Sequence, residues 1–172
     1  MRSGVIEHLL VIGYGNTLRR DDGAGVALAE EIAARWRAQG QVVRLHMAQQ
    51  LTPELAIEMA DDELTAVVFV DAAMTAPEGG IEIRRLHTET SSPSLGHQLG
   101  PAALMAYAGL FRPLLPPMWI VTIGGHDFAI GEGFSPAVAR LLATAPQVAS
   151  DLLAQINEDI ATCTKSGLLR TC

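Results

Sequence analysis

Short apolar runs alternate along the chain with segments of helical periodicity. The runs at 8–15, 65–73 and 116–125 are apolar at nearly every position, which predicts strands buried on both faces. Residues 41–47 form a further predicted strand. Residues 79–87 alternate apolar and polar side chains with one slip, a pattern typical of an edge strand.

Helices are predicted between these strands. Residues 21–40 carry apolar residues at three- and four-residue spacing; Asp21 or Asp22 can cap the first turn, and Gly40 can end the last. The other predicted helices are 52–60, about 98–111, and one from Ser135 and Pro136 to about Ile160.

The alternation of strands and helices predicts an α/β fold. We expect a three-layer sandwich, with a mostly parallel, twisted five-stranded sheet between helices on both faces. Residues 1–160 would form a single domain, and 161–172 a C-terminal tail. Cys163 and Cys172 are expected to be free thiols in this tail, with a disulfide or a metal site as the alternative.

Composition narrows the classes of function. Of the 172 residues, 49% are hydrophobic and 18% charged, the formal net charge is −7, and Lys165 is the only lysine. A basic face for nucleic acid is therefore not expected. No apolar run reaches the roughly 20 residues of a membrane span, and the first apolar run fits a strand better than a signal peptide. We expect a cytoplasmic protein, monomeric because no exposed apolar stripe is evident.

Candidate site residues follow several predicted strands. Asp21 and Asp22 come after the first strand, Asp71 lies at the end of the third, and His97 lies in the loop before the helix at about residue 98. In open parallel sheets, binding sites lie at the carboxyl ends of the strands. This topology could bring these side chains onto one rim.

The stretch "GYGNTLRRDDG" tests a nucleotide-binding interpretation. A dinucleotide fingerprint requires glycine at three positions, but Leu18 occupies the third. Asp21 and Asp22 would also repel a phosphate at the start of the helix. The turn is suited to presenting carboxylates. One aspartate is enough to cap the helix, so the second is left for another role.

Asp22, Asp71 and His97 together form a borderline ligand set. Two carboxylates and one imidazole suit Ni²⁺, Zn²⁺ or Mn²⁺ and leave coordination positions open. Each residue also has an ordinary alternative, because the aspartates can cap turns and the histidine can be a plain loop residue. There is no local metal-binding spacing and no nucleophile elbow, so the fold would have to assemble the site.

Four ordered motifs carry a resemblance to a known family. "GYGNTLRRDDGAGV", "VVFVDAA", "SLGHQLG" and "GFSPAV" resemble the signatures of the hydrogenase maturation endopeptidases, the first of which is G-x-G-N-x-L-x-x-D-D/E-x-x-G. The agreement spans about residues 8–155. After the fifth strand the sequence "GGHDFAIGEG" departs from the family's acid-rich segment, and Phe134 stands where leucine is usual.

The resemblance implies an activity and a substrate. Members of this family cleave a short C-terminal extension from the large-subunit precursor of nickel–iron hydrogenases after nickel has been inserted. The resemblance implies a phosphorylase/hydrolase-like fold and places the metal-contacting and catalytic residues at Asp22, Asp71 and His97. Nickel would be carried by the precursor, and the free protein would bind it only weakly; a sub-micromolar dissociation constant by calorimetry would contradict this.

Two other functions are retained as alternatives. One is a noncatalytic metal-checkpoint or chaperone protein that binds the precursor on the same fold, and the other is a nucleotide-binding regulatory domain. His126 and Asp127 could contact the substrate or support the site. Arg19 and Arg20 are expected to be solvated, with substrate contact as the alternative.

Overall fold

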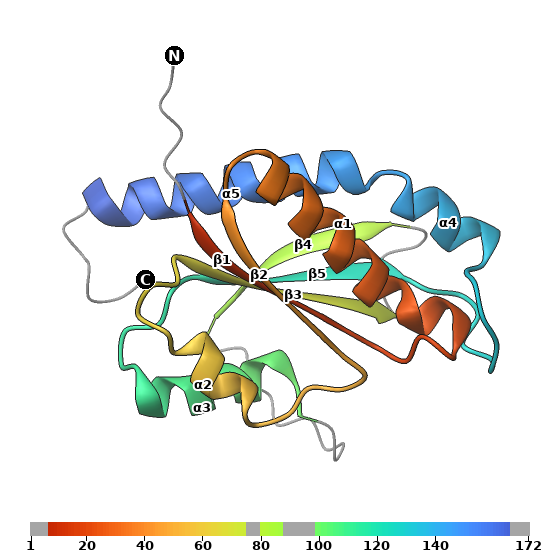
Figure 1. Ribbon diagram of the computed structural model, residues 1–172, viewed down its shortest axis with the longest axis horizontal. Helices are drawn as coiled ribbons and strands as arrows, with labels where there is room; N and C mark the ends of the chain where they lie inside the picture. The colour runs from red at the N-terminus through yellow and green to blue at the C-terminus, as the bar shows by residue number, and fades with distance from the viewer. Residues whose placement is uncertain (1–6, 75–79, 88–98, 166–172) are drawn as a thin grey trace.

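Five strands form one sheet at the centre of the molecule (Figure 1). The structure is a computed structural model that describes residues 7–74, 80–87 and 99–165. The sheet has the order β2-β1-β3-β5-β4, and only β4 runs antiparallel to its neighbour. The strands are β1 (His8–Tyr14), β2 (Val42–Ala48), β3 (Ala66–Ala73), β4 (Ile81–Leu86) and β5 (Met118–Gly124).

Helices cover both faces of the sheet (Figure 1). One face carries α1 (Ala24–Ala38), α4 (Pro136–Leu142) and α5 (Ala145–Lys165), and the other carries α2 (Leu55–Met59) and α3 (Pro101–Phe111). A 3-10 turn, η1 (Arg20–Gly23), precedes α1. The predicted α/β sandwich of three layers, with its mostly parallel five-stranded sheet, is confirmed.

The central strands are buried on both sides because alternate side chains enter two separate cores. Leu9 and Val11 of β1 pack with α1 and α5, whereas Leu10 and Ile12 pack with α2 and α3. Trp36 is fully buried in the first core, and its indole N–H donates a hydrogen bond of 2.8 Å to the carbonyl of Ala149. This bond fixes α1 against α5.

The helix predicted from Ser135 to Ile160 is two helices. The chain leaves the helical path after Leu142, and the hydroxyl of Thr144 donates to the carbonyl of Leu141 at 2.7 Å. Pro146 explains the break: it has no N–H to donate to the carbonyl of Leu142, so it cannot continue α4 and instead lies in the first turn of α5. Helix α5 continues to Lys165. The domain division at residue 160 stays a prediction. Cys172 and the side chain of Cys163 lie outside the described part of the chain.

Helix α1 lies unusually close to the ends of β1 and β3, and Gly25 makes this possible. A Cβ atom at Gly25 would lie 2.8 Å from the Cα of Asp71 and 2.9 Å from the carbonyl oxygens of Tyr14 and Val70. Any larger side chain would therefore push the helix off the sheet. The close approach brings the start of the helix to the carboxyl edge of the sheet.

Helix α3 is apolar on its outer side as well as its inner side. Tyr107, Leu110, Phe111 and the nearby Leu114 are all exposed. The expectation that the surface has no apolar stripe is wrong here, because the helix is apolar around its whole circumference. The monomeric state was expected because no apolar stripe was evident, so it stays a prediction that has lost this argument.

Within the described residues, no helix has the length and apolarity needed to span a membrane.

Candidate active site

Two loops meet at the carboxyl edge of the sheet. The first, residues 15–23, follows β1, and the second, residues 125–135, follows β5. Between them lies the end of β3 with Asp71. The two loops are more than a hundred residues apart in sequence, so the site depends on what joins them.

Asp21 joins the two loops through a buried carboxylate. Its side chain is fully buried; Oδ2 accepts the backbone N–H groups of His126 and Asp127, each at 2.9 Å, and Oδ1 accepts that of Ser135 at 2.7 Å. Burial alone would raise the pKa of Asp21, but these backbone donors outweigh it and hold the pKa below its usual value. Asp21 is therefore charged and structural.

Further contacts turn the two loops into one unit. The N–H of Arg20 donates to the carbonyl of Gly131 at 3.0 Å, and the N–H of Gly131 donates to that of Leu18 at 2.9 Å. Arg20 Nη1 lies 2.7 Å from Asp127 Oδ2. Arg20 also has a φ of 45°, which an L-residue adopts only at a cost. Arg20 is exposed, as expected, and is in addition paired with Asp127.

Asp22 points away from this structural network. Its Oδ2 accepts the backbone N–H of Asn16 at 3.0 Å, and its side chain is only partly buried. Gly15, at a φ of 141°, lies against the backbone of Asp22, where no side chain would fit. The prediction that one aspartate caps the helix is wrong, because Gly23 is the N-cap residue of α1 and no side chain caps it.

Asp71 is partly buried at the end of β3. It accepts hydrogen bonds from the hydroxyl of Tyr14 and from the N–H of Ala72. Burial raises the pKa of Asp71 to about 6, opposed by these two donors and reinforced by the negative charge of Asp22. The structure thus brings Asp22 and Asp71 onto the same rim, close enough for their charges to interact.

The remaining candidates are placed as follows. His97 lies outside the described residues. The imidazole of His126 is exposed, and its backbone serves Asp21. Asp127 pairs with Arg20 and accepts the N–H of Ala129 at 3.0 Å, which makes it a loop-stabilising residue. Across the described part of the chain, no three His, Cys, Asp or Glu side chains are grouped to hold a metal ion.

A carboxylate with a pKa near 6 has a defined chemical use. It is mostly ionised at neutral pH and is a stronger base than an ordinary aspartate, so it can take a proton from a bound water. Asp22 and Asp71 can also donate two oxygens to a metal ion. The pair is suited to hydrolysis, to metal contact, or to both.

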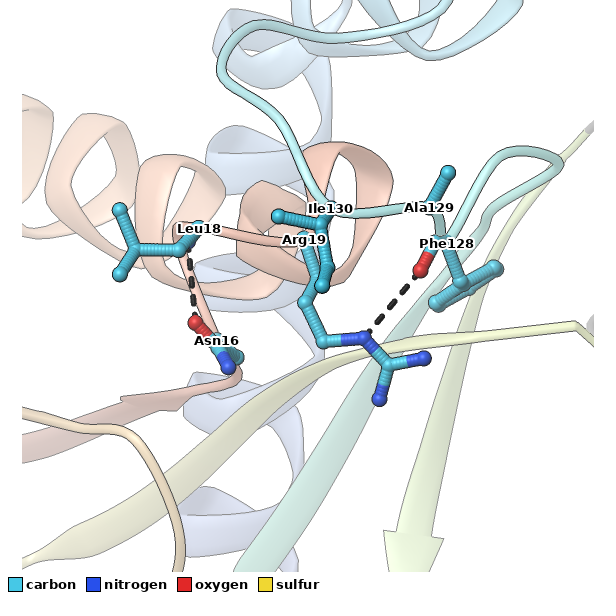
Figure 2. A pocket seen from close by; sticks show the side chains of 6 residues that line it. All are labelled: Asn16, Leu18, Arg19, Phe128, Ala129 and Ile130. Carbon is cyan, nitrogen blue, oxygen red and sulfur yellow. Dashed lines mark hydrogen bonds between the residues drawn. The ribbon is translucent and has the colours of Figure 1, made fainter.

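Two hollows flank the loop between Gly15 and Arg19. The larger has a volume of about 570 Å³ and is lined by Asn16, Leu18, Arg19, Phe128, Ala129 and Ile130 (Figure 2). The smaller, of about 280 Å³, lies towards β2 and is lined by Gly15, Asn16, Thr17, Leu18, Val26, Met47, Ala48 and Gln49. Asn16 and Leu18 line both, so they form a ridge between the hollows beside Asp22.

Comparison with solved structures assigns the fold. The nickel–iron hydrogenase maturation protease HycI from Thermococcus kodakarensis KOD1 superposes with a TM-score of 0.64 at 19% sequence identity, over 87% of this chain and 94% of that one. The hydrogenase maturating endopeptidase HybD from E. coli gives 0.59 at 21% identity, over 88% and 93%. An endopeptidase from Escherichia coli gives 0.61 at 22% identity, also over 88% and 93%.

The chain has the fold of the hydrogenase maturation proteases. No family model matches it, and no curated protein matches its sequence. At these low identities the likeness covers the course of the backbone over nearly the whole of each chain. The fold implied by the sequence motifs is thereby confirmed, and the activity is argued below from the site.

Sequence reasoning missed one residue of the site and the role of a second. Tyr14 supports Asp71, and the signal for it is a hydroxyl-bearing residue at the end of an otherwise apolar strand. Asp21 was a candidate, but its role in joining two loops was not predicted. Both roles depend on contacts between distant segments.

The adjacent aspartates provide a matched pair of variants. Asp21→Asn places an amide group against three N–H donors and should lower the free energy of unfolding by about 3 kcal/mol. Asp22→Asn keeps an acceptor for the N–H of Asn16 and should change stability by less than about 1 kcal/mol. Urea denaturation at pH 7 measures both.

The sign of the pH effect adds a control. Because folding lowers the pKa of Asp21, its contribution is complete above the usual aspartate pKa and is lost as the pH falls below it. The gap between wild type and Asp21→Asn should therefore shrink in acid. Equal losses for the two variants at pH 7 would refute the distinction between them.

Asp71→Asn should stabilise the protein at neutral pH. Because folding raises the pKa of Asp71 from 3.8 to about 6, stability falls as the pH rises through this window, and the deficit persists above it. The variant should gain about 2 kcal/mol at pH 7.5 and much less at pH 4, as measured by thermal unfolding. Asp62→Asn, whose side chain is 94% exposed, is the control. No gain at pH 7.5 would show that Asp71 is not strained by burial.

Proposed function

We propose that the protein is an endopeptidase that removes the C-terminal extension of a nickel–iron hydrogenase large-subunit precursor after nickel insertion. The observation that carries this proposal is the meeting of Asp22 and Asp71 at the carboxyl edge of the sheet, on a fold shared with hydrogenase maturation proteases. The names of those proteins support the reaction and the substrate, and the carboxylates support the chemistry.

Nickel enters the proposal as part of the substrate. Two carboxylates supply too few ligands to build a coordination sphere but enough to complete one that the precursor has begun. Asp22 and Asp71 would contact the nickel through its open positions, and His97 is proposed as the third contact. The metal would thereby fix the neighbouring peptide against the site.

The protein's own groups would then promote hydrolysis by water. The oxygen of Asp71 that does not contact nickel accepts a proton from the attacking water. Tyr14 holds the carboxylate of Asp71 in position, and nickel bound to the precursor can polarise the same water. Asp71 then gives this proton to the departing amine as the bond between the carbonyl carbon and the nitrogen breaks, which leaves a carboxylate and an amine.

This arrangement accounts for the timing of cleavage. A precursor without nickel offers the two carboxylates nothing to bind, so it would be left intact. A tight resting metal site would defeat this check. The proposal therefore requires that the isolated protein bind nickel weakly.

The direct test is the intact mass of a co-produced large-subunit precursor. We expect the loss of one C-terminal peptide with the wild-type protein and nickel, and no loss without nickel or without the protein. Asp22→Asn should abolish cleavage, because one contact to nickel is lost while the fold is kept. Arg35→Gln, an exposed change on α1, is the control and should cleave normally.

The other outcomes have defined meanings. An unchanged mass with stable co-purification of the two proteins would replace the protease by the noncatalytic checkpoint protein. Cleavage that is independent of nickel would preserve the peptidase and remove the metal from its recognition. An unchanged mass with no association, repeated with every large subunit of the source, would refute the proposed function.

A further inference from the structure

The larger hollow beside the candidate site is called the Arg19 groove and is defined by Asn16, Leu18, Arg19, Phe128, Ala129 and Ile130. Its wall is formed by both loops, so it exists only because they are joined (Figure 2). With a volume of about 570 Å³, it can hold two adjacent side chains of a peptide. Its chemistry is mixed, and the two components are considered in turn.

Arg19 supplies the charge. Its Nε donates to the carbonyl of Phe128 at 3.2 Å, which fixes the guanidinium plane, and the two terminal nitrogens extend beyond that bond (Figure 2). Within the described residues these two nitrogens have no hydrogen-bond partner, and Arg19 is the only charged residue lining the groove. A pre-oriented guanidinium with two free nitrogens is matched to a carboxylate.

Arg20 provides the contrast within the same loop. Its guanidinium is already neutralised by Asp127 at 2.7 Å. Arg20 therefore holds the two loops together through its ion pair, whereas the terminal nitrogens of Arg19 remain open to an anion.

Leu18 and Ile130 supply the apolar component. Leu18 is 62% exposed and Ile130 88% exposed, on opposite loops, and Phe128, which lines the same groove, is partly buried. Large apolar side chains held in water on either side of a groove indicate a contact surface for an apolar group. The groove thus offers one carboxylate contact and one apolar contact side by side.

Asn16 connects the groove to the candidate active site. Its side chain accepts the N–H of Leu18 at 3.0 Å at the groove, and its own N–H donates to Asp22 at 3.0 Å. Only Asn16 therefore separates a ligand in the groove from the carboxylate of Asp22, which is proposed to act in catalysis. The smaller hollow across the ridge has no charged lining residue, so the two sides differ in charge.

We propose that the Arg19 groove binds a segment of the precursor in which a carboxylate-bearing residue adjoins a large apolar residue. Arg19 pairs with the carboxylate, and Leu18 and Ile130 cover the apolar side chain. The groove acts as a specificity-determining subsite. It determines that the acidic part of the peptide binds on the Arg19 side of the ridge formed by Asn16 and Leu18, and not in the smaller hollow. This inference rests on the proposed endopeptidase function for the identity of the peptide.

Precursor cleavage tests the subsite. Arg19→Gln should raise KM by about 10-fold and change kcat little, because the contact is made before and during reaction alike. Arg35→Gln removes an equal charge elsewhere on the surface and should leave both constants unchanged. Neutralising the Asp and Glu residues near the cleaved bond of the precursor one at a time should identify one that reproduces the loss.

The double change locates the contact. Combined with Arg19→Gln, the substitution of that acidic residue should cause no further loss. An unchanged KM for Arg19→Gln, with thermal unfolding like that of the wild type, would overturn the proposal. Additive losses would also overturn it, because they would show that Arg19 and the carboxylate act independently.

A binding measurement separates this inference from the proposed function. The Nε–H resonance of Arg19 is followed by ¹⁵N NMR during titration with N-acetyl-Leu-Asp-amide and with N-acetyl-Leu-Asn-amide. Only the aspartate peptide should shift it, and Arg19→Gln should abolish the effect on the neighbouring Leu18 resonance. Equal responses to the two peptides would refute the charge pairing, whether or not the precursor is cleaved.

Discussion

A single buried carboxylate determines the geometry of this site. Asp21 is sealed from water, and three backbone N–H groups from the loop after β5 converge on it. Donors from a backbone cannot move without moving the loop, so their attraction to the charge fixes residues 125–135 against the loop after β1. The Arg19 groove and the outward direction of Asp22 both depend on this joint.

Adjacent aspartates consequently have opposite environments. Asp21 is fully buried and satisfied by hydrogen bonds, so it is held charged and inert. Asp22 is turned to the rim, where its charge acts on Asp71 and helps to raise the pKa of that carboxyl. The structural role and the proposed chemical role thus fall on adjacent residues of the same type.

The sequence predicts what depends on local pattern. Continuous apolar runs identified the buried strands, alternation identified β4 as an edge, and the rule that sites lie at carboxyl ends of parallel strands led to Asp22 and Asp71. The sequence did not predict the partners of Asp21, because these lie more than a hundred residues away. It also did not predict that Tyr14 supports Asp71. Pro146 was a local signal for the break between α4 and α5 that the periodicity obscured. The role of His97 stays a prediction.

The central claim is that Asp22 and Asp71 contact nickel that the precursor carries. Nickel K-edge absorption tests this directly, on the nickel-loaded precursor alone and in complex with the protein, using a precursor whose cleavage is blocked by proline after the cleaved bond. The claim predicts that complex formation adds oxygen donors to the nickel shell and that Asp22→Asn removes part of that change. A nickel spectrum that is identical in the free precursor and in a fully formed complex would contradict it.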